Sequence, residues 1–305
     1  LYIKDSTVIE QNRGLIYALT AYLIWGTFPL LFSLFKGVPA MEVLAHRIAW
    51  SAVFVAIIIT LTGKWHRIKA ALTNKQLILA LCCSTTLIAA NWGLYIWAAM
   101  NERAVEASLG YFIHPLVSVG LGVFFLKESL STYQKVALLL AIIAVVYKVT
   151  SSGALPWISL SLAASFALYG FVRKQTQVDT VTGLMIETTL ALPFTLIFWL
   201  FTPVNHFGFN LQGGLFILAG ILTAIPLLAF AAAARRISLS MIGFLMYLNP
   251  TLQLLCAVFI LGEPFTHTDL ITFSLIWTGL AIFTGGTYWR HRKDRLKLRP
   301  SVTSS

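Results

Sequence analysis

A duplicated apolar stretch limits what this chain can fold into more than any other feature. Shifting the sequence by 135 positions aligns Pro115 with Pro250, His114 with Asn249, and Glu128 with Glu263. Each copy is apolar for about the length that crosses a bilayer, holds one central proline preceded by a polar residue, and ends at a glutamate. The sequence therefore predicts a membrane segment that is present twice.

The composition supports a membrane location for the whole chain. Of its 305 residues, 58% are hydrophobic and only 11% are charged, and the mean hydropathy is +0.82. Soluble domains carry roughly 25% charged residues, so this chain has too little polar surface to cover a globule in water. We expect an all-α integral membrane protein.

Ten apolar segments are long enough to be spans, separated by short polar connections. Residues 1–13 form a polar cytoplasmic tail before the first span, which is too long for the apolar region of a cleavable signal peptide. Residues 290–305 form a basic tail that we expect to be disordered. The predicted spans are 14–35, 41–61, 76–100, 107–126, 133–149, 157–171, 183–201, 213–234, 239–261 and 270–289.

Basic residues predict the orientation of these spans. The net charge of +11 comes from Lys and Arg in alternate loops and in both tails, which is typical of cytoplasmic retention and not of nucleic-acid binding. With both termini cytoplasmic, the opposite side keeps only Lys36, Arg103 and Lys148. The cytoplasmic side then holds Lys4, Arg13, Lys64, Arg67, Lys69, Lys75, Lys127, Lys135, Arg173, Lys174, Arg235, Arg236 and the tail.

Five spans in each half make the two copies cross the membrane in opposite senses. We predict a first repeat over residues 14–150 and a second over 151–289. Earlier helices align at slightly larger offsets, with Trp25 on Tyr169 and Glu42 on Glu187. Inverted repeats that meet around a midplane cavity are typical of secondary transporters.

Ionisable residues within spans are costly, so they are the first candidates for a pathway. Glu42, His46 and Trp50 share one stripe of the second span, and Arg47 lies on the adjacent stripe. Glu42 and His46 could form a proton-responsive pair, or Glu42 could only complement the helix dipole. Arg47 could bind substrate or brace a neighbouring helix. Glu187, near the start of the seventh span, has the same two interpretations as Glu42.

Polar residues in three further spans complete the predicted pathway. Asn91 and Tyr95 share a face of the third span. Asn91 is a site candidate because an amide in hydrocarbon needs a hydrogen-bond partner. Pro115 and Pro250 could break their helices beside a cavity or only bend them for packing. The complete predicted pathway consists of His46, Arg47, Trp50, Asn91, Tyr95, Tyr111, His114, Tyr247 and Asn249, with helix breaks at Pro115 and Pro250 and possible proton coupling at Glu42, His46 and Glu187.

Motifs for cofactor chemistry are missing from the sequence. It contains no phosphate-binding GxxxxGK[ST] loop, no HExxH and no GxSxG, so we expect no cofactor, no metal and no enzyme activity. Cys82, Cys83 and Cys256 lie in apolar segments without ligand spacing, and we interpret them as small buried hydrophobic residues.

Several motifs resemble one known family. EVLAHRIAWS (42–51), NWGLYIWA (91–98), ERAVEASLGYFIHPL (102–116), AARRISLSMIGFLMYLNPT (233–251) and LGEPF (261–265) are similar to those of the RarD proteins in the EamA family of the drug/metabolite transporter superfamily. The resemblance implies a bacterial inner-membrane permease of ten helices in two inverted halves, often described by chloramphenicol sensitivity or resistance. His114 departs from the Asn that is more frequent in the RarD motif.

We therefore expect a secondary transporter that exports a small amphipathic metabolite or drug by alternating access, with a small molecule and membrane lipid as its partners. Two other classes stay open at this level. A non-transporting sensor or scaffold would need no polar residues around a central cavity. A membrane-embedded enzyme would need a nucleophile or an acid–base pair at contact distance.

Overall fold

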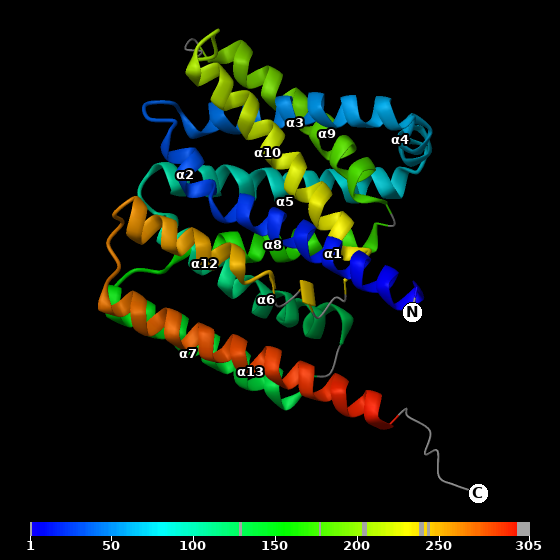
Figure 1. Cartoon of the computed structure of the whole chain (residues 1–305). Helices are drawn as coiled ribbons and strands as arrows, with labels where there is room; N and C mark the ends of the chain where they lie inside the picture. Colours follow the sequence, from blue (N-terminus) through cyan, green and yellow to red (C-terminus); the bar gives the residue numbers. More distant parts are fainter. Residues whose placement is uncertain are drawn as a thin grey trace, which may run out of the picture. The chain divides into compact units, whose positions relative to one another are not determined.

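The structure is a computed structural model. It describes residues 2–127, 130–176, 178–202, 206–237, 241–242 and 245–297, with side chains left out at 2–9, 126 and 287–297. The described part is helical between its connecting loops (Figure 1). Its helices are α1 (Tyr2–Gly26), α2 (Phe28–Ser33), α3 (Ala40–Thr62), α4 (Trp65–Leu72), α5 (Lys75–Met100), α6 (Ala104–Leu126), α7 (Thr132–Ser152), α8 (Trp157–Gln175), α9 (Thr180–Phe201), α10 (Leu211–Ala234), α12 (Leu248–Leu255), the π-helix η1 (Cys256–Ile260) and α13 (His267–Lys297).

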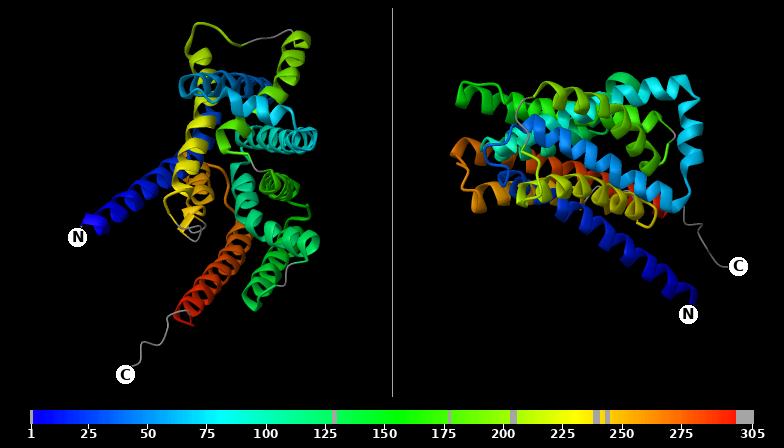
Figure 2. Two further views of the ribbon diagram at one scale, coloured as in Figure 1. Left: turned by 90° about the vertical axis from the view of Figure 1, so that its right-hand side faces the viewer. Right: turned by 90° about the horizontal axis from the view of Figure 1, so that it is seen from above.

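The helices divide into two compact units. The first unit contains residues 1–114 and 157–264, and the second contains residues 115–156 and 265–305. In the first unit, α3 packs against α9 and α10, α5 packs against α8, and α1 packs against α10 and α12 (Figure 2). All residues of the candidate site described below belong to this first unit.

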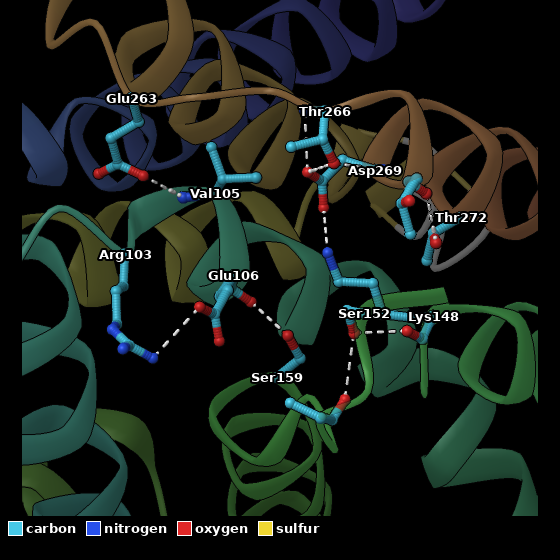
Figure 3. Close-up of polar contacts among 12 residues, drawn as sticks. Arg103, Val105, Glu106, Lys148, Ser152, Ser159, Glu263, Thr266, Asp269 and Thr272 are labelled. Atoms are coloured by element: carbon cyan, nitrogen blue, oxygen red, sulfur yellow. Dashed lines mark hydrogen bonds and ion pairs between the residues drawn. The ribbon is translucent and has the colours of Figure 1, made fainter. Parts of the chain in front are cut away.

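The second unit is built on the long contact between α7 and α13 (Figure 1). The Lys148 ammonium donates to the Asp269 carboxylate at 2.5 Å and ties the two helices together. Asp269 also accepts from the backbone N–H of Thr266, whose hydroxyl accepts from the N–H of Asp269 (Figure 3). This reciprocal cap satisfies donors that the first turn of α13 would otherwise leave open.

Glu263 caps helix α6, which lies far from it in the sequence, within the first unit. Its carboxylate accepts from the backbone N–H of Ala104 at 2.8 Å, at the start of α6. It also accepts from the N–H of Val105 at 2.8 Å (Figure 3). Burial raises the pKa of the Glu263 carboxyl, although the two N–H groups act in the opposite direction. The loop before α13 is thereby attached to the N-terminus of α6, where a negative charge is favourable.

Eight helices in the described part are long and apolar enough to cross a membrane. They correspond to predicted spans one to five, seven, eight and ten. The predicted sixth span is helix α8, which does not reach this criterion, and part of the ninth is the shorter apolar helix Leu248–Ile260. The all-helical membrane fold is confirmed, and the count of ten spans stays a prediction.

Both predicted tails differ from the structure. Helix α1 already begins at Tyr2, and α13 continues to Lys297, so the expected disorder is wrong for residues 290–297. The sequence between Gly286 and Pro300 contains no glycine or proline and is rich in Lys and Arg, which have high helix propensity.

The first span is interrupted where the prediction had one helix. Thr27 separates α1 from α2, and Pro29 follows at the start of α2. Proline has no backbone N–H to continue a helix, so the chain restarts at this point.

The two aligned prolines occupy different positions in their helices. Pro115 lies inside α6, which continues through it, so the predicted break does not occur there. Pro250 lies in the first turn of α12, where a missing N–H breaks no helical bond. Glu128, which aligns with Glu263, and Leu239, the predicted start of the ninth span, lie outside the described residues.

A glycine allows the closest approach between α3 and α10. A Cβ atom at Gly220 would lie 2.3 Å from the Trp50 Cβ and 2.8 Å from the Ser51 backbone nitrogen. Small residues of this kind let membrane helices come close enough for dispersion contacts to hold them. Since α3 carries Arg47, this contact also positions the candidate site.

Gly220→Ala should destabilise the protein by about 1–3 kcal/mol, because α3 must move away to make room for the methyl group. The measurement is thermal unfolding of purified protein in detergent. Gly214→Ala on the same helix is the matched control, since a Cβ there meets no atom within 4 Å. Equal melting temperatures for the two variants would contradict the close packing.

Candidate functional site

Arg47 is the centre of the candidate site. Its side chain is only 2% exposed in α3, and its Nε donates to the Thr223 hydroxyl of α10 at 2.6 Å. That is its only hydrogen bond among the described residues, where it has no carboxylate partner and where NH1 is buried without an acceptor. Leaving a buried charge without a counter-ion costs several kcal/mol, so this arrangement is unfavourable unless a ligand completes it.

Aromatic rings surround the Arg47 guanidinium in place of anions. Its central carbon lies 4.3 Å from the ring centre of Trp92, and 5.3 and 5.8 Å from those of Phe28 and Phe32. The faces of aromatic rings attract cations, most strongly for Trp. The rings stabilise the positive charge in an apolar setting, and they leave the remaining N–H donors of the guanidinium available.

The predicted Asn91 is already fully engaged in the structure. Its amide nitrogen donates to the Leu162 carbonyl at 3.0 Å and to the Ser165 hydroxyl at 2.9 Å. Its oxygen accepts from the Tyr111 hydroxyl at 3.1 Å. Asn91 therefore links α5, α6 and α8, and it holds Tyr111 in position beside the site.

Tyr95 offers a second unused polar group near Arg47. Its hydroxyl is buried and has no hydrogen-bond partner among the described residues. Its ring packs edge-on against Phe32 and against Tyr111, at 6.0 and 5.6 Å between centres. Tyr95 and Tyr111 pack in the same cluster as Phe28, Phe32 and Trp92, the three rings around Arg47. The structure thus brings Arg47, Asn91, Tyr95 and Tyr111 together, and their place in a substrate pathway stays a prediction.

His46 and Trp50 belong to a different group of side chains. The His46 ring lies 4.1 Å from Phe216 and 5.0 Å from Trp199, and it stacks on Phe207 at 5.1 Å. Trp50 packs against the same Phe207 at 5.8 Å. These two predicted pathway residues therefore lie in an aromatic cluster formed with α9, α10 and the connection between them.

Glu42 has a partner that the sequence did not suggest. Its carboxylate accepts from the backbone N–H of His206 at 2.7 Å and contacts the His206 ring nitrogen Nδ1 at 2.8 Å. The prediction paired Glu42 with His46 one turn along the same helix. In the structure it instead ties the start of α3 to the loop before α10.

Glu187 is held in a network that reaches three helices. Its carboxylate accepts from the Ser84 hydroxyl at 2.6 Å and from the Tyr169 hydroxyl at 3.4 Å. It also pairs with the Arg173 guanidinium at 3.6 Å, and both side chains are largely buried. Glu187 therefore links α5, α8 and α9.

The remaining predicted residues lie further along the first unit. The Asn249 oxygen accepts from the Gln253 amide at 2.9 Å, and that amide also donates to the Trp25 carbonyl at 3.3 Å. Tyr247 supplies its carbonyl to the Thr251 hydroxyl at 2.6 Å. The His114 ring packs edge-on against Phe166, 4.8 Å between centres.

Sequence reasoning missed Thr223, Phe28 and Phe32 as neighbours of Arg47, and Arg173 as the partner of Glu187. Arg173 was counted only as a cytoplasmic loop charge. The local signal at Phe28 and Phe32 was their spacing of four residues, which places both rings on one face of α2.

Among the cysteines, Cys256 is buried, whereas Cys83 is exposed, so its predicted burial is wrong. The described residues contain no group of three His, Cys, Asp or Glu side chains that could hold a metal.

Comparison with known proteins identifies the family. The sequence model of the EamA-like transporter family matches residues 12–150 and, a second time, residues 155–285. This chain belongs to the EamA-like transporter family. With eight span-length apolar helices, this membership makes the chain a multi-pass membrane transporter.

Individual bacterial relatives agree with the EamA-like assignment. Protein RarD of Escherichia coli K12 is 42% identical over 290 residues, which cover 93% of this chain and 98% of the relative. The uncharacterized transporter YojE of Bacillus subtilis 168 is 41% identical over 281 residues, covering 90% and 94%. The resemblance to RarD proteins predicted from the motifs is confirmed. One solved crystal structure at 19% identity and a TM-score of 0.59 covers 90% of this chain and supports the fold alone.

Glu187→Gln should lower the free energy of unfolding by about 2 kcal/mol, because it leaves the largely buried Arg173 charge without its counter-ion. Glutamine keeps the size of the side chain and an acceptor for Ser84. The measurement is thermal or denaturant unfolding in detergent. Glu106→Gln is the matched control, since Glu106 pairs with the exposed Arg103 and such pairs contribute little. A loss no larger than that of the control would mean that the pair does not stabilise the fold.

Proposed function

We propose that this protein is a secondary-active permease that exports a small amphipathic organic anion, a metabolite or a drug, across the bacterial inner membrane by alternating access. The observation that carries the proposal is the Arg47 guanidinium, which is buried, lacks a counter-ion among the described residues and has an unused N–H donor. Guanidinium groups bind carboxylates through paired hydrogen bonds, and they keep their charge at physiological pH.

The surroundings of Arg47 support an amphipathic substrate. Trp92, Phe28 and Phe32 provide apolar ring surface, and the Tyr95 hydroxyl provides a further polar contact. A substrate with one anionic group and an apolar body matches both parts of this site. Tyr111 and Asn91 complete the proposed binding site around Arg47. We assign five other residues to other parts of the substrate pathway: His46, Trp50, His114, Tyr247 and Asn249.

The proposed architecture has ten spans in two inverted repeats, over residues 14–150 and 151–289, with both termini cytoplasmic. Its support is the double match of the family model, the aligned segments and the distribution of basic loops. Glu42, His46 and Glu187 are the groups we propose for proton coupling. Glu42 and Glu187 align with each other in the two repeats, and each carboxylate is buried with a basic partner.

Arg47→Lys should impair export and Arg47→Ala should abolish it, because lysine retains the charge but lacks the planar pair of donors. Untargeted mass spectrometry of cells and medium, with and without the protein, identifies the exported anion and measures both variants. Arg103→Ala, in an exposed ion pair, is the control for general effects of removing an arginine.

The amount of monodisperse protein in detergent separates loss of transport from loss of folding. Full export by Arg47→Ala would remove this residue from the site. Loss of folded protein in both Arg47 variants would show that Arg47 is a structural brace.

The orientation predicts which loops react with an impermeant thiol reagent in intact cells. In a background without Cys82, Cys83 and Cys256, a cysteine at Thr73 should be protected, since the basic loop before α5 faces the cytoplasm. A cysteine at Ala154, in the exposed loop between α7 and α8, should react. Labelling of Thr73→Cys from outside, with Ala154→Cys protected, would reverse the proposed topology.

A further inference from the structure

One aromatic residue of α2, Phe32, lies beside Arg47 and also lines a separate pocket. The pocket has a volume of about 400 Å³ and lies where the loop after α2 meets the end of α5. Ligand pockets have typical volumes of 300–1,000 Å³, so a small organic molecule fits.

The lining of this pocket suits an amphipathic anion. Lys36 is the one ionisable residue that lines it, and Lys36 itself is exposed. Phe35, Val38, Trp97 and Met100 supply apolar walls, and Ser33 and Asn101 supply polar groups. Arg103 lies over the Trp97 ring at 5.8 Å, but it pairs with Glu106 and adds little net charge. The pocket therefore offers the same combination of one cation and apolar surface as the Arg47 site.

Phe32 belongs to both places. It lines the pocket, and its ring centre lies 5.8 Å from the Arg47 guanidinium carbon. The side chain is only 1% exposed, because it packs against Phe28, Phe35 and Tyr95 at 5.5, 6.4 and 6.0 Å. Phe28 also contacts Arg47, but it does not line the pocket.

The helix that carries Phe32 is short, and one residue, Thr27, interrupts the chain between it and α1. Helix α2 has six residues, follows the interruption at Thr27, and is followed by Gly37 with a positive φ of 79°. Chain segments with such ends can move as a unit, because a few residues absorb the change in backbone angles.

We infer that the pocket beside Lys36 is an outer binding subsite for the transported organic anion, and that the Phe32 ring separates it from the Arg47 site. The inference rests on the proposed function, since it assigns the pocket to the same substrate. The loops at Lys36 and Asn101 lie on the outer side in the proposed orientation. An exported anion then passes from Arg47 to Lys36 when the Phe32 ring moves aside.

The separation by Phe32 can be tested without knowing the substrate. In the cysteine-free background, Thr223→Cys places a thiol at the residue that contacts Arg47. The probe is sulfonatoethyl methanethiosulfonate, an anionic and impermeant thiol reagent, added to intact cells. Phe32→Ala should raise the labelling rate about tenfold or more, because removing one buried ring weakens the closed arrangement.

Phe28→Ala is the matched control for this experiment. It removes a phenyl ring from the same guanidinium but leaves Phe32 in the pocket wall, so we expect a smaller rise in the labelling rate than for Phe32→Ala. Phe32→Leu, which disturbs packing less, should give an intermediate rate and serves if Phe32→Ala does not fold. Equal rates in the Phe28 and Phe32 variants would overturn the role of Phe32, as would labelling of Thr223→Cys only in inverted membrane vesicles.

The preference of the pocket for anions is tested with Ser33→Cys. Its labelling by the anionic reagent is compared with labelling by trimethylammonioethyl methanethiosulfonate, a cationic reagent of similar size. Lys36→Gln should lower the anionic-to-cationic ratio about 25-fold, because one unit charge about 4 Å away in water changes each labelling rate about fivefold, in opposite directions. An unchanged ratio would overturn the assignment of an anion subsite.

The same reagents separate failure of this inference from failure of the proposed function. The proposed function predicts that the anionic reagent is favoured at Thr223→Cys and that Arg47→Gln removes this preference. If that preference is missing but Phe32→Ala still differs from Phe28→Ala, Arg47 is not the anion site, whereas the Phe32 ring does separate the pocket from Arg47. If the preference is present but Phe32→Ala has no effect, the substrate class stands and the outer route through Phe32 is wrong.

Discussion

The requirement that a buried charge must find compensation governs this structure. Hydrocarbon provides no hydrogen bonds, so each ionisable group in a span is paired, hydrated or held for a ligand. Glu187 is compensated by Arg173, Ser84 and Tyr169, and Glu42 by His206. Arg47 is the exception in the described part of the chain, since it has one hydrogen bond and an aromatic surround in place of an anion.

The packing of the first unit follows from the same requirement. Asn91 satisfies all its hydrogen-bonding groups only because α5, α6 and α8 converge on it. Gly220 lets α10 approach α3 so closely that Thr223 reaches the Arg47 Nε. Small residues at helix contacts and polar side chains that bridge helices are the two means by which membrane helices associate without a hydrophobic driving force.

Aromatic residues make the surroundings of Arg47 apolar. Phe28 and Phe32 come from a short helix set apart from α1, whereas Trp92 and Tyr95 come from the long helix α5. Rings can attract a cation and also exclude water, so the guanidinium lies in an apolar environment where electrostatic interactions are strong. One of these rings, Phe32, also lines the pocket beside Lys36.

The sequence alone determined the apolar helices, the membrane location, the resemblance to the EamA family and the polar residues that the spans contain. Those properties depend on composition and on short-range periodicity, which can be read from neighbouring residues. The tertiary structure decided which groups meet. Arg47 contacts Thr223 across 176 positions and Glu42 contacts His206 across 164, whereas periodicity suggested His46 as the partner of Glu42. Such contacts depend on the rotation and register of packed helices, which residues far apart in the chain determine together.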